Sequence, residues 1–337
     1  MKNKRVSSKD VARESGVSQA TVSYVLNNNP NVKIRPETRQ NVLDTAKRLN
    51  YHVNYIARNM RLRKSTSIGI VTNTEMASHI FIRTLEGIKD SLIDRNYSLT
   101  ICFGTPEDIS DAEYIKYYYS NLIDGIIFVF CHLSQKDIEY LEENSIPYVM
   151  INASPTQEEN FHIKTDFSVA MNEAIAGLKS SGIEDIGFLG HSAGLDGSVR
   201  YEAFLEAVVK NQISLDNIRA FKTRYNEKYL DDDIEDVLQG VKHPQAMICE
   251  TINAGFYFLR YVHRHNIQIP QDMSIITIGT TMFSERCYPA LSAVEAPLYN
   301  MGRRGVDLLF QIMEDDSKTL SDSIVLEWKF VKRESSI

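Results

Sequence analysis

A cluster of residues near the N-terminus has the side chains and spacing needed to contact DNA. After Gly16, Ser18 is a good helix N-cap, and Val22 and Leu26 then lie four residues apart on one helix face. The opposite face is left for other contacts. In a helix-turn-helix, early residues of the second helix reach base edges in the major groove, and short polar side chains suit phosphate oxygens. The predicted contact residues here are Gln19, Ala20, Thr21, Ser23, Tyr24 and Asn27.

The elements around this segment must hold it in place. A short helix with Val11 and Ala12 on its inner face is expected to end at Gly16, which forms the turn. A third helix is expected to start near Pro36, because proline is favoured in a first helical turn. Its apolar stripe is Val42, Ala46 and Leu49, and a fourth, basic stretch covers Tyr55 to Leu62.

Charge divides the chain in the same way. Residues 1–65 hold 14 Lys and Arg against 4 Asp and Glu, a net charge of +10, whereas the rest of the chain has a net charge of −17. A basic head on an acidic body is typical of a DNA-binding module joined to a module with another task. A solvated basic tail is the alternative, but the apolar positions at helical spacing argue against it.

The remaining residues alternate between short apolar runs and amphipathic stretches. This alternation predicts parallel sheets with helical crossovers, and the length predicts two lobes with a cleft between them. Ligands bind such folds at the carboxyl ends of strands. The expected helices include Phe81–Arg95 and Met171–Ser181, and the expected strands are Ser67–Thr72, Ser98–Phe103, Gly125–Phe130, Tyr148–Ile151, Ile186–Leu189, Ala246–Cys249 and Ser274–Ile278.

Two longer runs in the head carry a family resemblance. The run from Lys9 to Ser23, KDVARESGVSQATVS, and the run from Leu49 to Arg58, LNYHVNYIAR, resemble the head and hinge of the LacI/GalR family. The resemblance implies a helix-turn-helix domain at 1–53, a hinge helix and linker at 54–65, and a two-lobed effector-binding and dimerisation domain at 66–337. It further implies DNA contacts by the hinge residues Asn54, Ala57 and Met60.

The head departs from the family pattern at two of these positions. The family usually has arginine where this chain has Tyr24, and leucine, which wedges into the minor groove, where it has Met60. Methionine is an acceptable apolar wedge. A tyrosine hydroxyl, however, cannot make the bidentate pair with guanine that arginine makes. The operator is therefore expected to differ from the usual half-site at one base pair on each side.

The body is similar to the family's effector domain, which resembles periplasmic sugar-binding proteins. Carried over by position, the resemblance implies effector contacts by Asn152, Arg200, Glu250 and Thr281, and the aromatic ring of Phe81 is expected to stack on a sugar. Two positions that usually carry carboxylates are neutral here, and Glu250 replaces an amide, so the ligand itself does not carry over. Arg200 could instead form a structural salt bridge, and Phe81 could instead fill the core.

Other classes of protein find little support in the sequence. Cysteines and histidines show no metal-ligand spacing, and no cofactor is expected. Gly190-His191-Ser192-Ala193-Gly194 is only faintly like a nucleophile elbow, and no other catalytic motif is found. No apolar run is long enough to span a bilayer, and no signal peptide is recognised, so a cytoplasmic location is expected.

The sequence therefore predicts an α/β protein with an all-α helix-turn-helix head, without catalytic or metal residues. Its expected function is transcription regulation, as a homodimeric repressor of carbohydrate genes. Its expected partners are double-stranded DNA with a palindromic operator and a small-molecule effector, which is either a sugar or a sugar phosphate. No association with a membrane is expected. The alternatives are a regulator whose effector is a protein cofactor or absent, and a soluble sugar-binding protein without DNA function.

Overall fold

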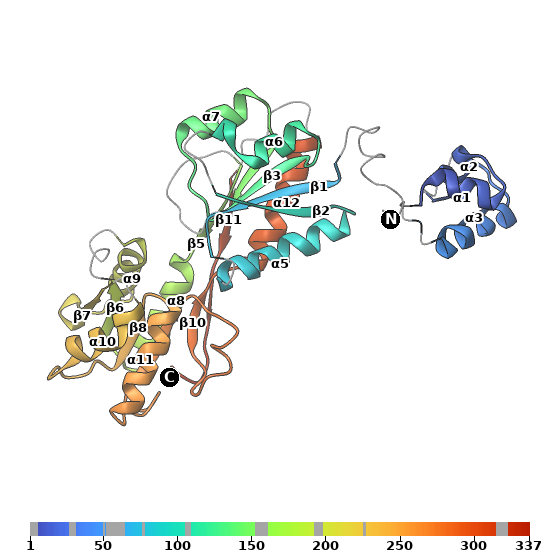
Figure 1. Ribbon diagram of the computed structural model, residues 1–337. Helices are drawn as coiled ribbons and strands as arrows, with labels where there is room; N and C mark the ends of the chain where they lie inside the picture. Colours follow the sequence, from blue (N-terminus) through green and yellow to red (C-terminus); the bar gives the residue numbers. More distant parts are fainter. Residues whose placement is uncertain are drawn as a thin grey trace. The chain divides into compact units, whose positions relative to one another are not determined.

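The computed structural model describes residues 6–26, 32–49, 51, 65–75, 78–104, 109–151, 161–191, 198–224, 227–314 and 323–337. It divides into two compact units, Met1–Ser65 and Thr66–Ile337, called here the head and the body (Figure 1). The hinge helix and linker predicted at 54–65 lie outside the described residues, except for Ser65.

The head packs three helices around a small apolar core, α1 (Ser8–Ser15), α2 (Gln19–Leu26) and α3 (Pro36–Arg48). Pro36 occupies the start of α3, as the sequence predicts. Asn41 of α3 donates from its amide to the Ser15 carbonyl at 3.0 Å, which ties α3 to the end of α1. The buried apolar side chains are Val11, Ala12, Val22, Val25, Val42 and Ala46.

The body contains two six-stranded sheets whose strands follow corresponding orders. The first lobe has the strand order β11-β5-β4-β3-β1-β2, and all its neighbouring strands are parallel. Its strands are β1 (Ser67–Thr72), β2 (Ser98–Phe103), β3 (Gly125–Val129), β4 (Tyr148–Ile151), β5 (His162–Asp166) and β11 (Ile324–Glu327).

The second lobe repeats this arrangement with the order β12-β10-β9-β8-β6-β7. Only β12 runs antiparallel to its neighbour. Its strands are β6 (Ile186–His191), β7 (Ile218–Thr223), β8 (Ala246–Cys249), β9 (Ser274–Ile278), β10 (Ser292–Glu295) and β12 (Lys329–Val331). The predicted α/β fold class is thus confirmed.

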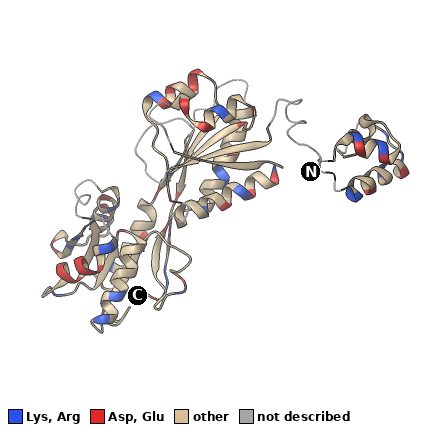
Figure 2. Ribbon diagram, in the orientation of Figure 1, with Lys and Arg blue, Asp and Glu red and all other residues tan. Residues whose placement is uncertain are grey.

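Helices cover both faces of each sheet, as strands that are buried along their whole length require. In the first lobe, α5 (His79–Asp94) and α12 (Leu298–Glu314) share one apolar cluster, and α6 (Glu113–Tyr119) and α7 (Gln135–Glu143) share the other. In the second lobe, α8 (Ser168–Ser180) and α9 (Val199–Lys210) cover one face, and α10 (Leu230–Leu238) and α11 (Ile252–Arg264) the other. The first turn of α10 is acidic (Figure 2).

Helices α5 and α12 approach each other at two glycines. A Cβ atom on Gly87 would lie 2.0 Å from the Tyr299 carbonyl oxygen, and one on Gly302 would lie 2.1 Å from the Thr84 carbonyl oxygen. Neither position can hold a larger residue without moving a helix backbone, because real Cβ atoms do not come this close. The first lobe therefore depends on this crossing.

The chain passes between the lobes at three places, β5 to α8, β10 to α12, and β11 to β12. At the third crossing, the main-chain N–H of Trp328 donates to the main-chain carbonyl of Asp166, at the first crossing, at 2.8 Å. The Trp328 ring lies 5.4 Å from that of Phe167, between centroids. The first and third crossings therefore lie side by side.

Four of the described residues are cysteines, and all are free thiols. Burial raises the pKa of both Cys102 and Cys131 to about 11, so these two thiols stay protonated near neutral pH.

Candidate functional site

The turn before α2 is fixed by local hydrogen bonds. Gly16 has a φ of 68°, in the left-handed region that favours glycine. The Val17 N–H returns to the Ala12 carbonyl at 3.1 Å, closing α1. The Ser18 hydroxyl accepts from the Thr21 N–H at 3.1 Å, which caps the start of α2. The turn and cap therefore set the direction in which α2 leaves α1.

Helix α2 has a buried face and an open face. Val22 and Val25 are buried, whereas Gln19, Ala20 and Tyr24 are exposed, with Tyr24 39 % exposed. Thr21 and Ser23 are half-buried at the border. The structure thus brings five of the six predicted contact residues onto one helix, and it leaves three of them on its solvent face. The sixth, Asn27, lies outside the described residues, as do the hinge residues Asn54, Ala57 and Met60.

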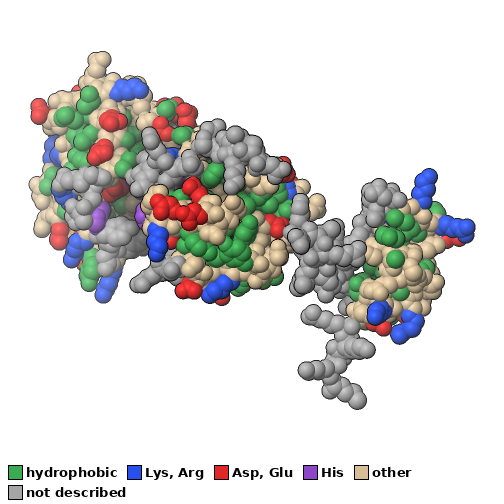
Figure 3. Space-filling view, turned by 90° about the horizontal axis from the view of Figure 1, so that it is seen from above, with side chains coloured by type: hydrophobic (Ala, Val, Ile, Leu, Met, Phe, Trp, Pro, Cys, Tyr) green, Lys and Arg blue, Asp and Glu red, His purple; other side chains and the backbone are tan. Residues whose placement is uncertain are grey.

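Gln19 has a contact that the sequence did not suggest. Its amide donates to the Ser8 hydroxyl of α1 at 2.7 Å. Because this hydrogen bond links the two side chains, Ser8 and Gln19 form one polar surface at the N-terminus of α2. Figure 3 shows Lys and Arg side chains at several points on the surface of the head. Such cations attract the phosphate backbone of a nucleic acid.

In the body, Arg200 and Glu250 meet at the carboxyl ends of β6 and β8. The Arg200 guanidinium donates to the Glu250 main-chain carbonyl at 2.7 Å. The Glu250 carboxylate accepts from the His191 N–H at 2.9 Å and from the Ser198 hydroxyl at 2.8 Å. Beneath it, burial raises the pKa of the Cys249 thiol, so that group stays neutral. Sequence reasoning did not single out His191 or Ser198 as site residues.

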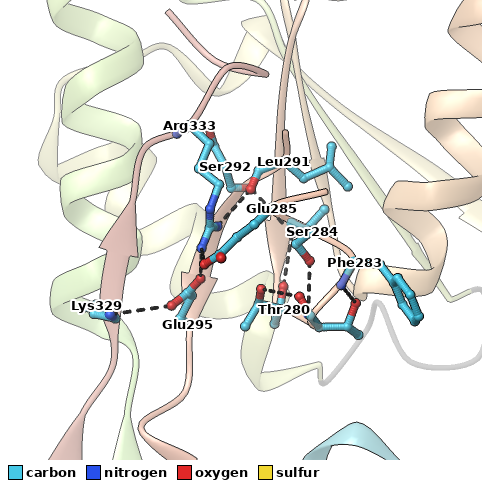
Figure 4. A network of polar contacts seen from close by, with 12 residues as sticks. Thr280, Phe283, Ser284, Glu285, Leu291, Ser292, Glu295, Lys329 and Arg333 are labelled. Atoms are coloured by element: carbon cyan, nitrogen blue, oxygen red, sulfur yellow. Dashed lines mark hydrogen bonds and ion pairs between the residues drawn. The ribbon is translucent and has the colours of Figure 1, made fainter. Parts of the chain in front are cut away.

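Thr281 follows β9 at the same edge and closes a tight loop. Its hydroxyl accepts from the Phe283 N–H at 3.2 Å, and its own N–H donates to the Ser284 hydroxyl at 3.0 Å. Ser284 is fully buried and was not predicted from the sequence. Figure 4 shows this loop beside a cluster of charged side chains from β10, β12 and the residues after β12.

Arg333 is the centre of that charged cluster. Its guanidinium lies 2.5 Å from the Glu295 carboxylate and 3.1 Å from that of Glu285, and it also donates to the Leu291 carbonyl at 2.9 Å (Figure 4). The Leu291 N–H in turn donates to the Ser284 carbonyl at 2.8 Å. Through Leu291 and Ser284, the charged cluster is thus connected to the Thr281 loop.

The other two predicted effector residues lie elsewhere or cannot be placed. Phe81 is fully buried in α5, within the apolar cluster shared with α12, which favours the core alternative for its ring. Asn152 directly follows β4 but lies outside the described residues. Arg200, Glu250 and Thr281 thus remain together along one sheet edge.

The described part of the chain shows neither a metal site nor a membrane-spanning helix. Within it, no three His, Cys, Asp or Glu side chains come together as a metal site would require. None of its helices combines the length and apolar character needed to cross a membrane.

Comparison with known proteins gives two domain matches. Residues 8–54 match the bacterial regulatory proteins of the lacI family, and residues 175–336 match a periplasmic binding protein-like domain. The chain belongs to the LacI family of bacterial regulatory proteins. It is a DNA-binding transcription regulator with a periplasmic binding protein-like body, as the sequence predicts.

Individual relatives extend along the whole chain. Catabolite control protein A of Priestia megaterium is 25 % identical over 318 residues, covering 94 % of each chain. The solved Lac repressor dimer bound to operator and an anti-inducer aligns with a TM-score of 0.79 and 20 % identity, over 99 % of this chain and 100 % of that one. A LacI family transcriptional regulator of Weissella paramesenteroides with bound glucose aligns with a TM-score of 0.65 and 17 % identity, over 80 % of this chain and 98 % of that one. These structural likenesses establish the fold of this LacI-family chain.

Proposed function

We propose that this LacI-family protein is a homodimeric repressor of carbohydrate genes that binds a palindromic operator. The observation that carries the proposal is the open face of α2, where Gln19, Ala20 and Tyr24 lie exposed on a helix held by a capped turn. A recognition helix must present such a face to the major groove. The proposal assigns no catalytic residue to the chain.

Selection of binding sites from random duplex DNA tests the DNA half of the proposal. We expect a palindrome whose half-sites are about one helical turn apart. The variant Gln19→Ala/Tyr24→Ala should lose sequence preference, whereas Gln40→Ala, at an exposed position of α3, should keep it. Enrichment of no sequence by the wild-type protein would contradict the proposal.

The dimer follows from the size of one head. A single helix-turn-helix covers one half-site and neutralises few phosphates, so useful affinity requires two heads. Light scattering at micromolar concentration should therefore give twice the chain mass of 38.4 kDa. A monomer at that concentration would be evidence against a palindromic operator.

The effector proposed for the body is a sugar or a sugar phosphate. The polar residues of the predicted site in the body, Arg200, Glu250 and Thr281, lie at the carboxyl ends of parallel strands, where ligands of such folds bind. Effector and operator must then change each other's affinity by the same factor, typically about 1–3 kcal/mol. The sugar can act either as inducer or as corepressor.

Thermal shift measurements with ribose, glucose, cellobiose and glucose 6-phosphate, followed by operator binding with each, test this half. A sugar that raises the melting temperature should also alter operator affinity. If none of the four does either, a protein cofactor or a ligand-free regulator becomes the better interpretation. A DNA-binding result would stand independently of that outcome.

A further inference from the structure

Glu250 was predicted to hold hydroxyl groups of an effector, but each oxygen of its carboxylate accepts a hydrogen bond from the chain. One oxygen accepts from the His191 N–H at the end of β6, and the other accepts from the Ser198 hydroxyl. Ser198 is the N-cap of α9, and its hydroxyl also accepts from the Tyr201 N–H at 3.4 Å. The carboxylate therefore joins the end of β6 to the start of α9.

The main chain of the same residue holds Arg200. The Glu250 carbonyl accepts from the guanidinium at 2.7 Å, and Arg200 lies in the first turn of α9, two residues after Ser198. A shift of Glu250 would thus move both the start of α9 and the partner of Arg200. One residue fixes the cation of the predicted effector site through two separate groups.

The strand beside Glu250 is shaped to admit this carboxylate. A Cβ atom on Gly190 would lie 2.9 Å from the carboxylate oxygen that accepts from His191, and 2.8 Å from the Phe188 ring. The absence of a side chain at position 190 leaves the space that the oxygen occupies. The glycine at position 190 thus makes room for the carboxylate that the hydrogen bonds hold.

We infer that Glu250 is a positioning residue of the effector site, which orients Arg200 and the start of α9 and does not itself bind the effector. This inference rests on the proposed function for the existence of an effector, but the contacts themselves do not depend on it. Its chemical consequence is that a neutral amide can replace the carboxylate. A glutamine oxygen can accept from His191 while its NH₂ donates to the Ser198 hydroxyl.

Amide hydrogen exchange at His191 in the ligand-free, full-length protein tests the contact. In Glu250→Ala the exchange rate should rise about tenfold or more, because a hydrogen bond to a charged group is lost. In Glu250→Gln it should stay within about threefold of wild type, since a neutral acceptor remains. Glu206→Gln, an exposed carboxylate on α9, is the matched control and should change nothing. Unchanged exchange in Glu250→Ala would overturn the inference.

Titration with glucose, cellobiose and glucose 6-phosphate tests the consequence for binding. Glu250→Gln should bind each ligand as wild type does, whereas Glu250→Ala should bind about tenfold more weakly because Arg200 is displaced. If Glu250→Gln falls as far as Glu250→Ala, the charge contacts the ligand and the inference is wrong. If wild type binds none of the three, the effector proposal fails for these sugars, and the exchange experiment still decides the contact.

A second variant covers the case in which Glu250→Ala does not fold. Ser198→Ala removes only the hydroxyl. The Glu250 carboxylate then keeps its hydrogen bond from the His191 N–H but loses the one that links it to the start of α9. Exchange at Tyr201, whose N–H the same hydroxyl accepts, should then rise while exchange at His191 stays near wild type. Protection of Tyr201 equal to wild type would show that Ser198 does not hold the helix start.

Discussion

The open face of α2 and the carboxyl edge of the second sheet use their side chains in opposite ways. In the head, Ala20 and Tyr24 are exposed and lie outside the apolar cluster that holds the three helices together. In the body, Thr251 and Thr281 each accept a backbone N–H two or three residues further along the chain, and Glu250 accepts the His191 N–H from the end of β6. A recognition face can be altered without cost to folding, whereas this sheet edge is part of what folds. Stability measurements should therefore separate the two regions.

The largest effect is expected where the body is packed most closely, at the crossing of α5 and α12. Gly302→Ala places a methyl group against the Thr84 carbonyl, so it should cost about 3 kcal/mol or more of the free energy of unfolding. Gly177→Ala is the control, because a Cβ there meets nothing within 4 Å inside α8. It should stabilise the protein by about 0.5–1 kcal/mol. Urea unfolding that ranks the two variants equally would refute the close crossing.

A smaller effect is expected from an ionisable ring inside the first sheet. Burial, with Lys164 second, lowers the pKa of His162 to about 4. Between pH 6.5 and 4 the unfolded chain therefore binds a proton that the folded one does not. The free energy of unfolding is fully retained above this window, and about 2 kcal/mol of it should be lost as the pH falls from 7 to 4.5. In urea unfolding measured across this pH range, His162→Gln should remove this loss of the free energy of unfolding. His132→Gln, at an exposed position, should keep it.

Thr251 tests the sheet edge itself. Its hydroxyl accepts from the Ala254 N–H at 3.1 Å and caps α11, so Thr251→Ala should cost about 1 kcal/mol. Thr251→Ser keeps the hydroxyl and should restore most of that loss. Equal unfolding midpoints for the alanine and serine variants would mean that the cap adds nothing, and the contrast between edge and head would weaken.

Tyr24 should show the smallest effect on stability and the clearest effect on DNA. Tyr24→Ala should leave the free energy of unfolding within about 0.5 kcal/mol of wild type, as for other exposed positions. Tyr24→Arg should change the preferred half-site at one base pair, because arginine gains a bidentate contact with guanine worth about 1–3 kcal/mol. Site selection with both proteins decides, and identical preferred sites would mean that Tyr24 faces the phosphate backbone.

The head was the easier part to predict from sequence. A glycine turn, a capping serine and a first-turn proline act within a few residues, and all three lie where they were expected. Buried apolar strands such as β1 and β9 were also located to the residue. Strand β5 was missed because His162, Lys164 and Thr165 break its apolar run, and β12 because it has only three residues.

The body's candidate site was harder to predict because its contacts are distant in sequence. Glu250 and His191 are 59 residues apart, and only the pairing of β6 with β8 brings them together. Family position suggested that Glu250 faces a ligand, whereas its hydrogen bonds face the chain. In the sequence, Phe81 is only an aromatic residue near the start of a helix. Its packing in the cluster shared with α12 shows that its ring is part of the core.

The topology of the first lobe has a consequence for its synthesis. Strands β1 to β5 leave the ribosome early, but α12, which packs against α5, and the edge strand β11 come more than a hundred residues later. At about 5–20 residues per second, the interval between β5 and α12 lasts roughly 7–30 s. During that time the nascent sheet exposes Ile70, Ile127 and Val149, which α12 will later cover together with α5. The head can fold as soon as it emerges, while the first lobe must wait and is the part of the nascent chain on which chaperones are expected to act.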